Sequence, residues 1–251
     1  MSGHSKWSTI KRKKAKEDAK RGKIYTKVIK QIVIAAKEGG GDPDTNPALR
    51  TAVQTARDNN MPKKNISKAI KRGTGELPGV NYERCSFEGY APGGVAVFVN
   101  CLTDNHNRTS AEVRHLFNKY NGHLGEPHSV SYLFERKGQI VFEESQMEEE
   151  TVYEIALENG AEDIILDDGY YEIICAPENF EALHQNIAKA GIECETAEIT
   201  LIPNSEVKLD ASHAVSVLKL MDALEDHDDV ENVSSNFDIP DEILEQIQDE
   251  I

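Results

Sequence analysis

Lysines and hydrophobic residues follow a helical period in the first third of the chain. Between residues 11 and 37 the lysines recur at spacings of three and four, which places them along one face of a helix. The pattern predicts one long helix, or two abutting helices with a joint at Gly22, ended by the glycines at 39–41. The opposite side carries an apolar stripe of Ile24, Tyr25, Val28, Ile29, Ile32 and Ala36.

Two shorter helices are expected after this segment. Asn46 and Pro47 stand in the order preferred at a helix start, with the asparagine as cap and the proline as first helical residue. Pro62 opens another helix, which Gly73 ends. Both helices keep small apolar residues on one side and basic residues on the other. The sequence therefore predicts a compact three-helix bundle.

The hydrophobic period changes to two after residue 79. Strands are predicted over 82–90 and 95–102, joined by a turn rich in proline and glycine. A capping-box pattern at Thr109 predicts a helix over 109–120. A further strand is expected over 130–134.

Residues 139–202 form a self-contained pattern of strand, helix, strand, strand, helix and strand, which is the order of the ferredoxin-like fold. A helix over 211–224 and a strand over 230–237 follow. We expect an α+β fold, with an N-terminal three-helix domain and a middle α+β domain interrupted by an inserted ferredoxin-like α+β domain. The expected limits are 1–78 for the helical domain, 79–137 plus 203–251 for the middle domain, and 138–202 for the insertion.

Charge is distributed very unevenly along the chain. The net charge of the 251 residues is −16, yet residues 1–75 hold nineteen Lys or Arg and six Asp or Glu, a net of +13. The remaining residues hold nine and thirty-eight, a net of −29. Such asymmetry indicates a polyanion as the partner of the basic part.

The lysine stripe has two interpretations. The lysines solvate an outer helix face, or they bind phosphates. Solvation alone does not need six like charges in register, and like charges at this spacing repel, so we favour binding. The six lysines in register are Lys13, Lys16, Lys20, Lys23, Lys27 and Lys30. The expected nucleic-acid-binding residues are His4, Lys6, Trp7, Lys11, Arg12, Lys13, Lys14, Lys16, Lys20, Arg21, Lys23, Lys27, Lys30, Arg50, Lys63, Lys64 and Lys68.

Trp7 is the only tryptophan in the chain and precedes the basic run. An indole beside cations suits stacking on an unpaired base. A hydrophobic staple that buries Trp7 against the first helix is an equally good interpretation.

The sequence contains no pattern typical of catalysis, a metal site or a cofactor site. The four cysteines are widely spaced without a CxxC pair, and the eight histidines show no metal-ligand spacing. Asp104, His106 and Ser110 lie on a polar segment where Asp and Ser more often cap helices than form a hydrolytic triad. We expect a cytoplasmic protein that is not an enzyme, has no membrane partner and needs no cofactor. No sequence pattern indicates an oligomeric state.

A cluster of acidic residues follows the last predicted helix, at Asp222, Glu225, Asp226, Asp228 and Asp229. The cluster has three interpretations: it repels nucleic acid from the acidic body of the chain (residues 76–251), it contacts a basic protein, or it only confers solubility.

Several long motifs make the chain resemble a known family. They are residues 1–7 (MSGHSKW), 18–23 (DAKRGK), 39–44 (GGGDPD), 59–62 (NNMP), 88–94 (EGYAPGG), 104–114 with Thr109 and Glu112, 224–226 (LED) and 228–230 (DDV). With these motifs, from residue 1 to about residue 240, the chain resembles the YebC/PmpR family. One departure is His128 before Ser129 and Val130, where the family usually has glycine.

The resemblance implies three domains and a cytoplasmic DNA-binding regulator of transcription. It also implies an alternative, because members of the family have been tied to translation as ribosome-associated factors that help synthesis of proline runs. Two partners therefore remain open: duplex DNA and ribosomal or other structured RNA. Lysine contacts phosphate as a point charge and does not read bases, so the stripe itself favours neither.

Overall fold

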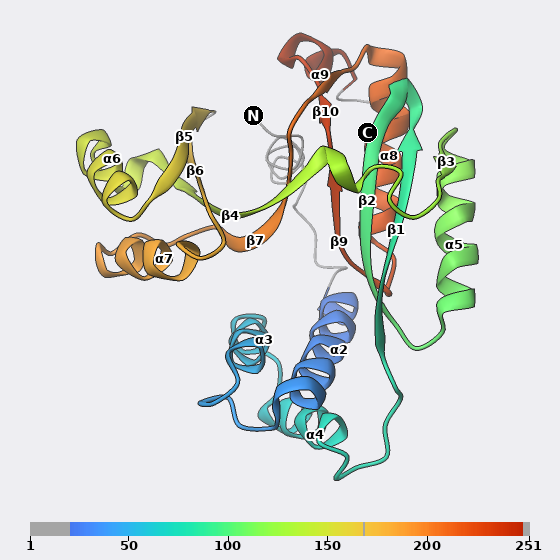
Figure 1. The fold of residues 1–251 in the computed structure, drawn as a ribbon, viewed down its shortest axis with the longest axis vertical. Coiled ribbons are helices and arrows are strands. Elements are labelled where there is room, and N and C mark those ends of the chain that lie inside the picture. Colours follow the sequence, from blue (N-terminus) through green and yellow to red (C-terminus); the bar gives the residue numbers. More distant parts are fainter. Residues whose placement is uncertain (1–20, 168, 248–251) are drawn as a thin grey trace.

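The computed structural model describes residues 21–167 and 169–247. A helical head, a central sheet and a second sheet to one side of it are separate in space, and each has its own hydrophobic core (Figure 1). Helices and antiparallel sheets together confirm the expected α+β class. Within the described residues, no helix combines the length and the apolar composition needed to cross a membrane.

The head consists of α2 (Arg21–Gly39), α3 (Pro47–Asp58) and α4 (Lys63–Gly73), and α2 packs against both of the others. Its core includes Ile32, Leu49 and Ala56, all fully buried. Asn46 caps α3 as predicted, because its Oδ1 accepts from the backbone N–H of Leu49 at 3.1 Å. The amide nitrogen of Asn46 also donates to the carbonyl of Ala35 at 2.8 Å, which ties α3 to α2.

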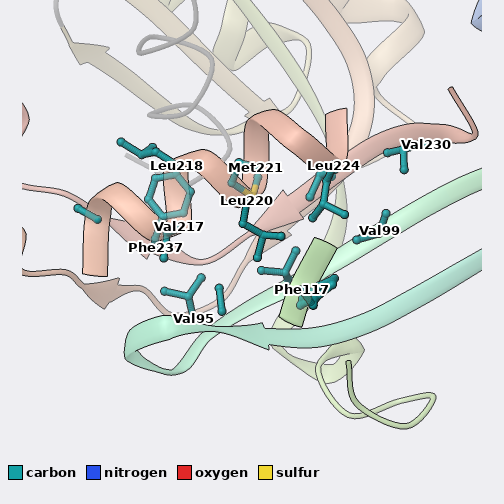
Figure 2. Close-up of a cluster of buried hydrophobic side chains, with 14 of the residues drawn as sticks. Val95, Val99, Phe117, Val217, Leu218, Leu220, Met221, Leu224, Val230 and Phe237 are labelled. Atoms are coloured by element: carbon teal, nitrogen blue, oxygen red, sulfur yellow. The ribbon is translucent and has the colours of Figure 1, made fainter. Parts of the chain in front are cut away.

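The central sheet has the order β3-β1-β2-β9. Its strands are β1 (Glu83–Ala91), β2 (Val95–Thr103), β3 (His123–Leu124) and β9 (Val230–Ser235). Helices α5 (His106–Lys119) and α8 (Ala211–Glu225) pack on each other and on this sheet. Figure 2 shows the resulting core, where Leu220 and Leu224 of α8 meet Val99 and Phe117.

The second sheet has the order β5-β6-β4-β7. It consists of β4 (Phe134–Glu143), β5 (Ala161–Asp167), β6 (Tyr170–Cys175) and β7 (Thr196–Pro203), with α6 (Glu149–Glu158) and α7 (Phe180–Lys189). Strand order and element order together are those of the ferredoxin-like fold. Because β9 completes the central sheet only after this unit, the ferredoxin-like unit interrupts the middle α+β unit, as the sequence predicts.

Several short elements complete the chain. They are η2 (Pro92–Gly94), η3 (Ser131–Leu133), η4 (Glu144–Gln146), β8 (Val207–Lys208), β10 (Phe237–Asp238) and α9 (Asp241–Ile247). The parallel pair β8 and β10 lies outside both four-stranded sheets.

Two local predictions are wrong, and one helix was not predicted. The strand expected over 130–134 is instead the short turn η3, and β4 begins only at Phe134. Thr109 does not cap α5, because Asn105 does so by accepting from the N–H of Arg108 at 3.1 Å. Helix α9 was not predicted at all.

Candidate nucleic-acid interface

Helix α4 presents a continuous cationic face to solvent. Ile66 and Ala69 point into the head core, and the helix contains no acidic residue. Among the described residues, no ion pair neutralises its basic side chains. The exposed cations are Lys63, Lys64, Lys68, Lys71 and Arg72.

The spacing of these cations suits an extended polyanion. Lys64, Lys68 and Lys71 follow one another at four and three residues, so they lie on one side of the helix. At about 1.5 Å of rise per residue, the row spans about 10 Å. Lys71 and Arg72 were not among the expected site residues, although the same helical spacing already placed them on this face.

Three lysines of α2 that were expected to bind nucleic acid contact the acidic cluster of the body instead: Lys23, Lys27 and Lys30. Lys23 pairs with Asp226 at 3.4 Å, and both side chains are about half exposed. Lys27 Nζ donates to the backbone carbonyl of Glu225 at 2.6 Å, at the end of α8. A helix C-terminus carries partial negative charge, so it attracts such an ammonium group.

Lys30 is the most deeply placed of these lysines, with an exposure of 7%. Its ammonium group lies 2.5 Å from Oδ1 of Asp229, which is 4% exposed, and donates to the carbonyl of Asp228 at 2.9 Å. A buried charge is tolerated only when it is paired and hydrogen-bonded. The expectation that Lys30 lies on an outward face is therefore wrong.

Asp229 is the centre of a buried polar network. Its Oδ2 accepts from Arg108 at 2.6 Å, from Thr109 at 2.7 Å and from Thr103 at 3.2 Å. Burial by itself raises the pKa of Asp229, but the hydrogen bonds from Lys30, Arg108 and Thr109 outweigh it and hold the pKa well below its ordinary value. The carboxylate is therefore charged across the neutral range.

The other expected site residues fall into two groups. Lys63 and Lys64 are exposed on α4, with Lys68 one turn further on. Arg50 is exposed, but its guanidinium donates to the carbonyls of Pro43 at 3.0 Å and Asp44 at 2.8 Å, so it also holds the turn before α3. His4, Lys6, Trp7, Lys11, Arg12, Lys13, Lys14, Lys16, Lys20 and the side chain of Arg21 lie outside the described residues.

A cleft of about 800 Å³ lies where the head meets the body. Lys23 and Lys30 contribute to one wall, and Arg108 and His115 of α5 contribute to another. The acidic residues Asp226 to Asp229 also line the cleft. This cleft is the meeting point of the basic and the acidic parts of the chain.

Three residues near the cleft resemble a metal-ligand set, since single ligand atoms of Glu112, His227 and Asp229 lie within 4.8 Å of one another. Their hydrogen bonds do not fit a metal ion. Nδ1 of His227 accepts from the N–H of Asp229 at 3.1 Å, so Nε2 carries the proton toward Glu112 at 2.9 Å. Both oxygens of Asp229 are already held by cations and hydroxyls. The trio is best described as a hydrogen-bonded support for the loop at the end of α8.

Comparison with known proteins gives the family of the chain. Residues 5–76 match the family model described as the TACO1/YebC protein N-terminal domain, and residues 82–237 match the TACO1/YebC second and third domain. The chain belongs to the TACO1/YebC family.

Relatives match this chain over its whole length. A protein of Halothermothrix orenii is 53% identical over 100% of both chains, and one of Geobacter sulfurreducens is 54% identical over 98% of this chain and 100% of its own. Both are named probable transcriptional regulatory proteins. A crystal structure of a conserved hypothetical protein from Aquifex aeolicus superposes with a TM-score of 0.82 at 48% identity, over 90% of this chain and 93% of that one. The relatives' names support a regulatory function.

Proposed function

We propose that this chain is a cytoplasmic nucleic-acid-binding regulatory protein, of the transcriptional type for which its relatives are named, and not an enzyme. The observation that carries the proposal is the outward face of α4, where five cations lie in one short helix without an acidic residue. Phosphate groups are the ligands that such a face attracts. The basic run at residues 11–21 adds further cations in the sequence.

Binding through such a face depends on charge more than on base sequence. Four of the five cations are lysines, which contact phosphates as point charges and do not pair with base edges as arginine does. We therefore expect affinity that falls steeply with salt and discriminates little between sequences.

This composition suits ribosomal RNA, the alternative partner, equally well. A regulator of chosen promoters needs groups that read base edges, and the exposed face of α4 offers few. A ribosome-associated translation factor needs only contacts to a structured RNA backbone and its shape.

The decisive experiment measures binding to promoter-sized duplex DNA and to ribosomes at matched, near-physiological salt. Dissociation constants of about 10⁻⁴–10⁻⁶ M for DNA are the non-specific range. If DNA binding stays in that range while ribosomes bind much more tightly, the transcriptional form of the proposal is refuted and the translational form is supported.

A charge-matched pair of variants tests the site. In the first variant Lys64, Lys68 and Lys71 are replaced by Gln, and in the control the exposed body residues Lys189, Lys208 and Lys219 are replaced by Gln. Each lost phosphate contact reduces the magnitude of the negative slope of log K against log salt by about 0.9 on DNA. The magnitude of this slope should therefore be about 2–3 smaller for the α4 variant than for wild type. Equal binding by both variants would refute the assignment to α4.

A further inference from the structure

Helix α5 differs from the rest of the acidic body in its charge. Residues 76–251 hold nine Lys or Arg against thirty-eight Asp or Glu, yet Arg108, Arg114 and Lys119 all lie within this one helix. The one acidic residue of the helix, Glu112, is bound by His227 at 2.9 Å and lies 3.9 Å from Arg108. Arg108 is paired with Asp229 and Asp104, so the exposed positive charge of α5 comes from Arg114 and Lys119.

A row of polar side chains follows this outer side. Asn107, Ser110, Arg114 and Asn118 are spaced by three or four residues, so they form a stripe about 16 Å long at 1.5 Å of rise per residue. With His115 they line a shallow hollow of about 460 Å³. None of these five side chains has a hydrogen-bond or ion-pair partner among the described residues.

The helix that carries this polar row is anchored in the core. On the inner side of the same helix, Val113 and Phe117 are fully buried in the core shared with α8. Asn105 caps the helix, and Thr109 donates to the buried carboxylate of Asp229 at 2.7 Å. The helix that carries the stripe is therefore fixed before any ligand arrives, and only the exposed side chains have to be ordered on binding.

The hollow also adjoins the head. Ala111 and His115 line both the hollow and the cleft between head and body, and Lys23 lines the same cleft from α2. In the sequence, a single residue, Gly22, separates Lys23 from the basic run at residues 11–21. The head and α5 therefore border the same cleft.

We propose that the outer face of α5, carried by Asn107, Ser110, Arg114, His115 and Asn118, is a second contact for the phosphodiester backbone of the nucleic acid that the head binds. This inference rests on the proposed function. Arg114 supplies the charge, and the amides and the hydroxyl donate to phosphate or sugar oxygens, which positions the strand without reading its sequence. Two contact regions on one molecule would also restrict the orientation of the bound strand.

The test replaces one arginine and compares it with a body lysine that is also exposed. Arg114→Gln is measured beside Lys189→Gln for the salt dependence of binding, with the full-length chain and the same DNA and ribosomes as above. We expect Arg114→Gln to reduce the slope of log K against log salt by about 1, and Lys189→Gln to leave it unchanged. Arg114→Glu should weaken binding further, because it adds repulsion.

Each outcome separates this inference from the proposed function. If the α4 variant loses binding while Arg114→Gln and Arg114→Glu bind like wild type, the second contact is refuted and the head site stands. If the wild-type chain binds neither DNA nor ribosomes, the proposed function itself fails. If poly-glutamate competes at α5 as well as nucleic acid of equal charge does, the surface recognises acidic peptides and the phosphodiester assignment is overturned.

Discussion

Nζ of Lys30 and Oδ1 of Asp229 lie 2.5 Å apart, although 199 positions separate the two residues in the chain. This pair joins the basic head to the acidic body, with Lys27 and Lys23 making weaker contacts beside it. The acidic cluster thus has a basic partner within its own chain. Exposed ion pairs add little stability, but a buried, hydrogen-bonded pair is costly to break.

Removing one member of this pair should destabilise the protein strongly. We expect Asp229→Leu to lower the free energy of unfolding by about 3–5 kcal/mol, because it leaves Lys30 as an uncompensated buried charge. Lys30→Met should cost less, since Asp229 keeps Arg108 and Thr109. Chemical denaturation of both single variants and of the double variant measures the coupling energy between Lys30 and Asp229. Strictly additive changes in the free energy of unfolding would contradict an interaction between the two residues. Lys37→Met, at an exposed site on the same helix, is the control and should change stability by less than about 0.5 kcal/mol.

Acid should weaken the junction between head and body. The pKa of Asp229 is below its unfolded value, so the stability it contributes is complete above the ordinary aspartate pKa of about 3.9 and is lost as the pH falls through the folded value. We expect unfolding free energies measured from pH 7 down to pH 2 to decrease more steeply for wild type than for Asp229→Asn. Parallel curves would show that this carboxylate does not contribute to acid unfolding.

Glu88 should be needed to hold the loop before β4. Its buried carboxylate accepts from the backbone N–H groups of His128, Val130 and Ser131, each at 2.8 Å. Burial raises the pKa of Glu88, but these hydrogen bonds outweigh it and keep the pKa below its usual value. Glu88→Gln puts an NH₂ group where only acceptors fit, so we expect a loss of about 1–3 kcal/mol.

Amide hydrogen exchange provides the local measurement for this variant. The amides of Val130 and Ser131 should exchange faster in Glu88→Gln, while those of β6 in the ferredoxin-like unit stay as protected as in wild type. Unchanged protection at Val130 would mean that the loop is held by something other than this carboxylate.

Glycine at position 128 should make the protein more stable than His128 does. Its backbone is left-handed, with φ of 69°, which costs a residue with a side chain about 1–2 kcal/mol. Glycine avoids this cost but loses about 0.5–1 kcal/mol through its larger unfolded-state entropy. His128→Gly should therefore raise the melting temperature slightly, and His128→Ala, which keeps the strain, should not. The same backbone geometry accounts for the glycine that the family resemblance leads one to expect here.

Periodicity alone was enough for much of the fold. The helical stripe that contains Val28 and Ile32, the cap at Asn46 and the strand–helix order of residues 139–202 are all local patterns, and each corresponds to what the structure contains. The turn at Ser131–Leu133 was missed because its conformation depends on hydrogen bonds to Glu88, more than forty positions away.

The candidate site was less accessible to sequence reasoning. Helical spacing places Lys30 on a lysine face, but only tertiary contact shows that this face meets Asp229. Thr109 matched a capping pattern, whereas its hydroxyl is used inside the helix to donate to that same carboxylate. In both cases the deciding partner is more than a hundred residues away, so no local pattern could reveal it.

Strands β4 and β7 make the ferredoxin-like unit a modular part of the molecule. Phe134 and Pro203 are direct partners in the antiparallel register, so the chain leaves the middle unit and returns to it at neighbouring points. Directly opposed residues in such a pair have Cα atoms about 4.5–5.5 Å apart, a gap that a short turn can close. An ancestor without the insertion, or an engineered chain with another domain at this point, would therefore need no new path through the central sheet.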